Sequence, residues 1–248
     1  MSTAEFVLVD ISNSFTKVAF SSRSQVGRIL RLPTSELTDK TLAKLLGKRK
    51  ARHAIAASVV PGKNKAVESA LPLGVCWVTH ETRLGIGIEY PNPKTIGADR
   101  LANAVAAKAL YGAPAIVVDF GTAVTFDVIS PEGNYIGGVI APGLASMTDY
   151  LHNRTALLPK IELREPQRAI GRSTLEAMRS GAVHGYRGLV AEILRQIACE
   201  LPSRSPIHVI ATGGDATLIA GQTKLFSAVA PGLTLDGLRL IGCKNFGS

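Results

Sequence analysis

The 248-residue sequence lacks a long apolar run, paired cysteines and clustered histidines. No segment approaches the roughly 18 to 20 continuous apolar residues that a membrane-spanning helix needs, so a membrane is not an expected partner. The three cysteines and five histidines are scattered, without the spacings of a zinc site or a disulfide framework. The N-terminal residues show no basic segment followed by an apolar one, and we therefore expect no export and a cytoplasmic location.

Aromatic and acidic side chains are both scarce. Aromatics make up 5% of the chain, and the formal net charge is +9. A basic protein can bind nucleic acid, but so few aromatics leave few platforms on which single-stranded bases could stack. The positive charge has one local cluster, between Lys44 and Arg52, and is otherwise dispersed. We interpret it as a solvated basic face that steers an anionic substrate, and nucleic acid is not an expected partner.

Two common nucleotide-binding motifs are also missing. The sequence contains no Gly-x-x-x-x-Gly-Lys-Ser/Thr motif, and no Gly-x-Gly-x-x-Gly motif follows a predicted strand. Both motifs bring backbone N–H groups to phosphate, so their absence disfavours a P-loop kinase and a Rossmann-type dinucleotide enzyme.

What the chain does contain is one pattern that occurs twice. The runs Phe6–Asp10 and Ala115–Asp119 are apolar, rich in β-branched residues, and end in an aspartate. A short turn with hydroxyl side chains and a second apolar run follow each of them, which predicts a strand, a tight turn and a returning strand. The carboxylate at the bend could hold a metal ion, and turn N–H and hydroxyl groups can bind phosphate. The repetition predicts a duplicated fold with a nucleotide between its two copies.

Helical and strand patterns alternate along the chain, which predicts the α/β class. Helical patterns cover 39–46, 64–71, 99–110, about 143–153, 173–201 (as one or two helices) and 215–221. Strand patterns cover 5–10, 16–20, 54–60, 75–78, 115–120, 123–129, 135–140 and 206–212, and segments 229–232 and 238–243 close the chain. We expect a domain boundary at Gly112-Ala-Pro114, with domains 1–112 and 113–248 and no flexible linker between them.

The segment Gly97-Ala-Asp99-Arg100 carries the most specific chemistry. Phosphoryl transfer needs phosphate-binding donors, a divalent metal and a carboxylate that orients the acceptor hydroxyl. Asp99 could be that carboxylate, and Arg100 beside it could clamp a substrate carboxylate. Together they are typical of a kinase for a small hydroxy acid. The plain alternative is that Asp99 only caps the helix that follows.

Other residues could bind the nucleotide. Asp10 and Asp119 could contact metal ions, although an aspartate at a strand end often only stabilises a turn. Gly213 and Gly214 follow a strand and open a short helix, so a flat adenine ring could approach the backbone, or the pair could be a plain strand-to-helix turn. The donors that could surround phosphate are Ser12, Asn13, Ser14, Thr16, Lys17 and Thr122.

Taken together, the motifs resemble the type III pantothenate kinases, in the superfamily of acetate and sugar kinases, heat-shock ATPases and actin. The resemblance covers nearly the full length, and its specificity comes from several motifs in the family's order. These are Asp10-Ile-Ser-Asn-Ser14 to Lys17, Tyr90-Pro-Asn-Pro93, Gly97-Ala-Asp99-Arg100-Leu-Ala-Asn103, Asp119-Phe-Gly-Thr122, Gly137 to Gly143, Gly171-Arg-Ser-Thr174-Leu-Glu-Ala177, Gly213-Gly214-Asp215 and Pro231 to Leu238.

The resemblance implies two RNase H-like domains with mixed sheets, a homodimer, and phosphorylation of the primary hydroxyl of pantothenate by ATP, the first step toward coenzyme A. It makes Asp99 the base. It assigns Asp119 to a monovalent cation, K⁺ or NH₄⁺, and places Asp10 near Mg²⁺. Pantothenate contacts would come from Tyr90, Gly97, Arg100 and Thr174, and ATP contacts from Asp10, Ser12, Asn13, Ser14, Thr16, Lys17, Thr122, Gly213 and Gly214.

The first motif departs from the family pattern Asp-x-Gly-Asn-Thr, because Ser12 stands at the glycine position and Ser14 at the threonine position. If the turn needs a positive φ at Ser12, the serine is strained there and nucleotide affinity falls. Two alternatives follow. One is a weakened family member that acts as a regulatory, nucleic-acid-associated factor. The other is an RNase H-like nuclease using Asp10, Asp119 and Asp127 around two metals, which would leave the Asp99 segment without a role.

Overall fold

A computed structural model describes residues 3–201 and 205–247 of the chain. They form two compact units that are not continuous in sequence. Unit 1 contains the residues up to Gly112 together with 133–136 and the C-terminal stretch from Gly232, and unit 2 contains 113–132 and 137–231. The units separate after residue 112, where we expect the domain boundary, but the C-terminal helix packs in unit 1.

Unit 1 is built on a mixed five-stranded sheet in the order β3-β2-β1-β4-β5. The central strand β1 is antiparallel to β2 and parallel to β4. Its residues Phe6 to Ile11 are all buried, which explains why this strand is a continuous apolar run rather than an alternating one. The strands are β1 (Ala4–Ile11), β2 (Phe15–Ser21), β3 (Leu30–Pro33), β4 (Ala51–Ser58) and β5 (Val75–Trp77).

Unit 2 repeats this arrangement strand for strand. Its sheet has the order β10-β9-β6-β7-β8, and its central strand β6 is antiparallel to β7 and parallel to β9. The strands are β6 (Ala115–Phe120), β7 (Ala123–Ile129), β8 (Tyr135–Pro142), β9 (His208–Gly213) and β10 (Ala228–Val229). The repeated topology confirms the predicted α/β class and the duplicated, RNase H-like fold with mixed sheets.

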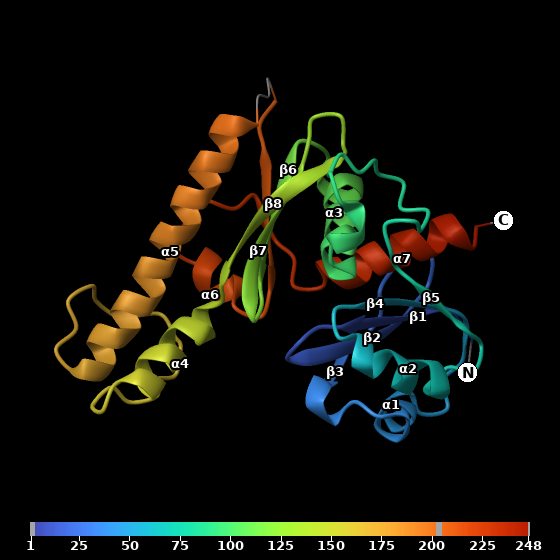
Figure 1. The fold of residues 1–248 in the computed structure, drawn as a ribbon, viewed down its shortest axis with the longest axis horizontal. Helices are drawn as coiled ribbons and strands as arrows, with labels where there is room; N and C mark the ends of the chain where they lie inside the picture. Colours follow the sequence, from blue (N-terminus) through green and yellow to red (C-terminus); the bar gives the residue numbers. More distant parts are fainter. Residues whose placement is uncertain (1–2, 202–204, 248) are drawn as a thin grey trace. The chain divides into compact units, whose positions relative to one another are not determined.

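The helices cover the sheets of their own units. Unit 1 has η1 (Thr34–Glu36), α1 (Asp39–Leu46), η2 (Pro61–Lys63), α2 (Asn64–Ala70), η3 (Pro93–Thr95), α3 (Ala98–Tyr111) and α7 (Leu233–Asn245), and unit 2 has α4 (Leu144–Arg154), α5 (Thr174–Glu200) and α6 (Ala216–Ala220). In unit 1, α7 packs against α3 and against strands β1 and β4 (Figure 1). Gly237 of α7 faces the carbonyl of Ala102 so closely that a side chain there would collide with it.

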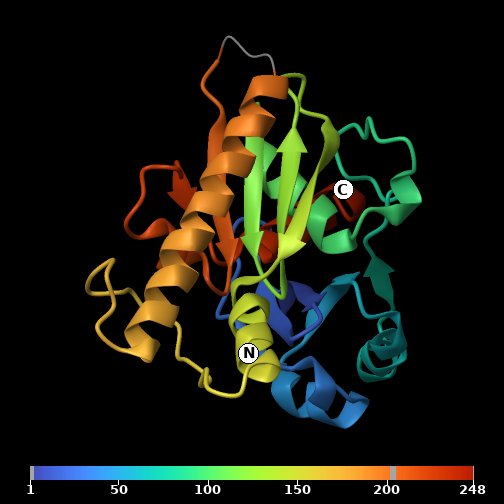
Figure 2. The same cartoon turned by 60° about the vertical axis from the view of Figure 1, so that its left-hand side comes forward.

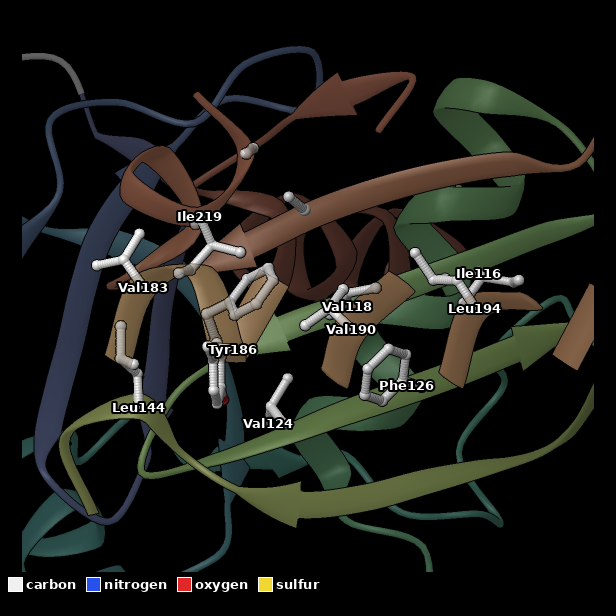
Figure 3. Close-up of a cluster of buried hydrophobic side chains, with 14 residues drawn as sticks. Ile116, Val118, Val124, Phe126, Leu144, Val183, Tyr186, Val190, Leu194 and Ile219 are labelled. Carbon is white, nitrogen blue, oxygen red and sulfur yellow. The ribbon is translucent and has the colours of Figure 1, made fainter. Parts of the chain in front are cut away.

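In unit 2 the long helix α5 runs along the sheet (Figure 2). Its buried residues Val183, Tyr186 and Val190 meet side chains from the strands, among them Val118 and Phe126 (Figure 3). Burying an aliphatic side chain of this size stabilises a fold by roughly 1.5 to 3 kcal/mol. The core therefore fixes the ends of β6 and β9, where the predicted site residues of unit 2 lie.

Several elements differ from the sequence expectation, each for a tertiary reason. Strand β4 begins at Ala51 rather than Ala54, because Ala51 pairs with Ala4 of β1. The edge strand β3 and the two-residue strand β10 have no alternating pattern of their own and form by pairing with β2 and β9. The pattern over 173–201 is one continuous helix. Within the described part of the chain, no helix is long and apolar enough to cross a membrane.

Candidate functional site

The bend after β1 holds a buried carboxylate whose two oxygens both have partners. Asp10 is 1% exposed. The Ser12 hydroxyl donates to its Oδ1 atom at 3.0 Å, and the Lys17 ammonium lies 3.6 Å from its Oδ2 atom. Lys17 stands directly across the hairpin from Asp10, so the β1–β2 register itself brings the two charges together. A buried carboxylate without such partners would be strongly unfavourable.

The turn itself spans Ser12 to Ser14, between β1 and β2. Asn13 and Ser14 are exposed, whereas Thr16 is fully buried and bonds the Thr34 hydroxyl at 3.1 Å. Among the described residues, only glycines have a positive φ, so Ser12 is not in the left-handed region. The strain that a positive φ would cause at Ser12 is therefore absent.

Asp99 lies in the first turn of α3, one residue inside the helix start at Ala98. Its Oδ1 atom accepts a hydrogen bond of 2.8 Å from the Arg100 backbone N–H. Gly97 is the N-cap, and no side chain caps the helix. Asp99 thus bonds one N–H of the first turn without being the N-cap residue, at the helix end where a negative charge is favourable.

Gly97 makes room for this carboxylate. A Cβ on Gly97 would lie 2.5 Å from Asp99 Oδ1 and 3.4 Å from Val59 Cγ1. Since real Cβ atoms do not come that close to an oxygen, a larger residue at position 97 would displace Asp99. The predicted residues Gly97, Asp99 and Arg100, neighbours in sequence, thus lie together at the start of α3.

The Tyr135 ring contacts two predicted residues, Tyr90 and Arg100. The sequence analysis did not predict a role for Tyr135. Its ring is fully buried in unit 1. It lies 6.1 Å from the Tyr90 ring in an edge-to-face contact, and the Arg100 guanidinium is 5.8 Å from its centroid. Its backbone also pairs with Gly87 and Glu89. No local pattern could have revealed this role, because the partners come from distant parts of the chain.

In unit 2, Asp119 at the end of β6 meets Gly213 at the end of β9. A Cβ on Gly213 would lie 2.5 Å from Asp119 Oδ1 and 2.5 Å from the Phe120 carbonyl oxygen. Gly213 also has a φ of +93°, which side-chain-bearing residues rarely adopt. The Asp119 carboxylate oxygen and the Phe120 carbonyl oxygen thus leave no room for a side chain at position 213, which must be glycine. The Gly214 N–H donates to the same carbonyl at 2.9 Å.

The remaining predicted residues of unit 2 lie at the exposed ends of its elements. Thr122 is exposed, and its carbonyl oxygen accepts hydrogen bonds from the Gly143 N–H and the Ser146 hydroxyl, each at 3.1 Å. Thr174 is the first residue of α5, after the N-cap Ser173, whose hydroxyl accepts from the Glu176 N–H. A helix N-terminus of this kind favours a carboxylate or phosphate.

Two groups near these residues have shifted pKa values. Burial raises the pKa of Asp215, which follows Gly214. Burial, and secondarily the nearby Asp215 charge, also raise the pKa of Tyr186, whose hydroxyl donates to the Pro142 carbonyl. Within residues 3–201 and 205–247, no group of three or more His, Cys, Asp or Glu side chains lies where it could hold a metal ion. A surface hollow of about 570 Å³, lined partly by Glu5 and Arg23, contains none of the predicted residues.

Comparison with known proteins agrees with these motifs. The family model described as type III pantothenate kinase matches residues 6–196. A type III pantothenate kinase of Akkermansia muciniphila is 50% identical over 97% of this chain and 99% of its own length. The protein of the same name from Methylacidiphilum infernorum is 45% identical over 95% of this chain and 87% of its own.

The fold is shared more widely. The solved structure of an inorganic polyphosphate/ATP-glucomannokinase from Arthrobacter sp. strain KM covers 98% of this chain and 100% of its own, with a TM-score of 0.51 and 15% identity. At that identity the likeness concerns the fold alone. The family match over most of the chain, and the nearly full-length relatives, show that this chain belongs to the type III pantothenate kinase family.

Proposed function

We propose that this chain transfers the γ-phosphoryl group of ATP to the primary hydroxyl of pantothenate, forming 4'-phosphopantothenate in the first step of coenzyme A synthesis. Full-length relatives that carry the name of this enzyme support the proposal. The observation that carries it is the arrangement of Asp99 and Arg100 in the first turn of α3. The same relatives favour the kinase over a regulatory factor or a nuclease.

Asp99 is the proposed base. The pantothenate hydroxyl oxygen forms a bond to the γ-phosphorus, the bond from that phosphorus to the β–γ bridging oxygen breaks, and ADP leaves. The hydroxyl proton passes to the Asp99 carboxylate. The Arg100 N–H holds this carboxylate at 2.8 Å, and Gly97 leaves the space that it occupies. Such positioning matters because phosphoryl transfer depends mostly on orientation and electrostatics.

The substrate carboxylate would be bound by Arg100, and Tyr90, Gly97 and Thr174 would be further pantothenate contacts. Arg100 supplies a fixed fork of donors for a carboxylate, and its guanidinium rests near the buried Tyr135 ring. Thr174 offers a hydroxyl at the start of α5, where the helix dipole also favours a negative charge. The basic surface of the chain suits two anionic substrates.

ATP would be bound by the turns after β1 and β6 and by Gly213 and Gly214. The exposed Asn13 and Ser14 and the Lys17 ammonium suit the phosphates. Thr122 is exposed in the corresponding turn of unit 2. Gly213 and Gly214 present bare backbone, which suits the adenine end of the nucleotide.

We propose that two cations take part, one beside Asp10 and one beside Asp119. Mg²⁺ keeps several waters and takes one or two carboxylates together with phosphates, and the single carboxylate of Asp10 fits such a hydrated ion beside ATP. When bound, it would neutralise charge on the phosphates. Near Asp119, the carboxylate and the Phe120 carbonyl oxygen converge on Gly213. We propose that the Asp119 carboxylate is the ligand that K⁺ or NH₄⁺ would bind there.

We further propose that the chain is a homodimer and works in the cytoplasm. Several large apolar side chains of unit 2 are exposed, which is typical of a surface that another chain covers. They lie on β8, on α4, in the segment between α4 and α5, and at the start of α5: Ile140, Met147, Tyr150, Leu151, Leu157, Ile170 and Leu175. Sedimentation of the purified chain would check the dimer, and a monomer at micromolar concentration would contradict it.

The test of the function is phosphorylation of pantothenate by ATP, with and without K⁺. We expect K⁺ to stimulate the wild-type chain and Asp99→Asn to lower kcat by about 10² to 10⁴, the usual weight of a general base, while both substrates still bind. Asp39→Asn is the matched control, because Asp39 also lies in the first turn of a helix but is exposed on α1. Wild-type turnover by Asp99→Asn would refute the base, and no activity of the wild type would refute the kinase.

A further inference from the structure

Thr34 is a buried residue to which the sequence analysis gave no role. It opens η1 directly after the edge strand β3 and is 3% exposed. Its hydroxyl donates to the Ser12 carbonyl oxygen at 2.7 Å, and its backbone N–H donates to the Ser14 carbonyl oxygen at 3.0 Å. One residue therefore holds two carbonyls of the turn that follows β1, those of Ser12 and Ser14.

The Thr16 hydroxyl forms a hydrogen bond with the Thr34 hydroxyl. Their hydroxyl oxygens are 3.1 Å apart. A threonine hydroxyl has one hydrogen to donate, and that of Thr34 goes to Ser12, so Thr16 is the donor in this pair. The result is a chain of hydrogen bonds from Thr16 through Thr34 to the Ser12 carbonyl. Because Thr16 is fully buried and committed in this way, its hydroxyl acts on the turn rather than on a ligand.

These bonds determine where the turn's N–H groups point. In a trans peptide the C=O and the N–H of the same plane point in opposite directions. Once the carbonyls of Ser12 and Ser14 are held by Thr34, the N–H groups of Asn13 and Phe15 must point away from it. Successive N–H groups of a turn are what binds an anion such as phosphate.

We propose that Thr34 is a positioning residue for ATP: it fixes the two peptide planes of the Ser12–Ser14 turn so that their N–H groups meet the nucleotide's phosphates, and Thr16 acts through it. The inference rests on the proposed function, because it takes this turn as the phosphate-binding turn. The sequence suggested that Thr16 contacts ATP directly. In the present proposal Thr16 acts on ATP only through Thr34.

The test compares Thr34→Val, which keeps the shape and the N–H but removes the hydroxyl, with Thr34→Ser, which keeps the hydroxyl. We expect Thr34→Val to raise both the Kd for ADP, measured by calorimetry, and the KM for ATP by about tenfold, roughly the equivalent of one hydrogen bond. The KM for pantothenate should change less than twofold. Thr34→Ser should restore ADP affinity to within about threefold of the wild-type chain.

Two further variants separate positioning from folding. Thr148→Val removes another buried hydroxyl, which bonds the Ala145 carbonyl in α4, and it should leave ADP affinity unchanged. Thr16→Val should weaken ADP binding about threefold, and Thr16→Val combined with Thr34→Val should be no weaker than Thr34→Val alone. The Thr16→Val arm keeps the inference testable if Thr34→Val does not fold.

The outcomes distinguish this inference from the function on which it rests. Unchanged ADP affinity in Thr34→Val, or equal losses for both substrates, would overturn the role of Thr34 while leaving the kinase intact. If the losses of ADP affinity add in the double variant, Thr16 contacts the nucleotide directly. If the wild-type chain binds ADP but does not phosphorylate pantothenate, the proposed function fails and the calorimetric comparison still decides the role of Thr34. Wild-type protein that binds no ADP would overturn both.

Discussion

The Oδ1 atom of Asp99 lies 2.5 Å from the position that a Cβ on Gly97 would occupy. The carboxylate therefore uses space that only glycine leaves open. The Arg100 N–H holds the same oxygen at 2.8 Å. Steric room on one side and a hydrogen bond on the other thus fix the proposed base.

We expect Gly97→Ala to lower kcat by about 10- to 100-fold, because the new methyl group must displace the carboxylate and small displacements of a reacting group are costly. The KM for ATP should stay within about twofold of the wild-type value. Steady-state kinetics with each substrate varied would measure both effects.

The control for this substitution is Gly181→Ala in α5, where an added Cβ meets no atom within 4 Å. Alanine is preferred to glycine in a helix by roughly 0.8 to 1 kcal/mol, so this variant should be active and at least as stable as the wild-type chain. Unchanged kcat in Gly97→Ala would show that the carboxylate can move without consequence.

Ser12→Gly restores the residue that the family motif usually has, and we expect no gain from it. Ser12 has no positive φ to relieve, and its hydroxyl donates to the buried Asp10 carboxylate. Loss of that bond should cost about 1 kcal/mol of stability and raise the KM for ATP a few fold.

Ser12→Ala separates the hydroxyl from the backbone and should behave like Ser12→Gly in ATP kinetics. Thermal unfolding and the KM for ATP would be measured for both variants. A Ser12→Gly variant that turns over faster than the wild-type chain would show that the serine does hinder the nucleotide.

The pair of Glu165 and Arg187 predicts a pH-dependent contribution to stability. Hydrogen bonds from Arg187 hold the pKa of Glu165 below its ordinary value. A lowered carboxyl pKa stabilises the fold above the unfolded-state pKa, near 4.3, and the effect is lost as the pH falls through the folded-state value. Because the Glu165 side chain is 40% exposed, solvent screening limits the effect to roughly 1 kcal/mol.

Glu165→Gln should therefore lower the free energy of unfolding at pH 7, and the difference from the wild-type chain should shrink toward pH 3. Urea unfolding at several pH values would measure it. Glu192→Gln is the control: Arg195 lowers the pKa of Glu192 to about 2, but both side chains are more than half exposed, so its effect should be smaller. A difference for Glu165→Gln that is constant with pH would contradict the ion pair.

Much of this molecule could be predicted because its signals are local. The strand–turn–strand units at Asp10 and Asp119, the helix after Gly97 and the α/β class follow from periodicity, turn residues and motif order. Helix α1 begins after Thr38, whose side chain accepts from the Thr41 N–H, and ends at Gly47 with a φ of 64°. These features depend on residues that are neighbours in sequence, so the sequence reveals them.

Tertiary packing decided the rest. Thr34 reaches the turn after Asp10 only because β3 pairs with β2. Tyr135 reaches Tyr90 and Arg100 only because residues 133–136 pack in unit 1. The sequence by itself determined the family, the strand pattern and the identity of the proposed base. The tertiary structure decided that Ser12 is unstrained and that Thr16 is buried, because hydrogen bonds between distant segments, and not local propensity, fix the conformation of that turn.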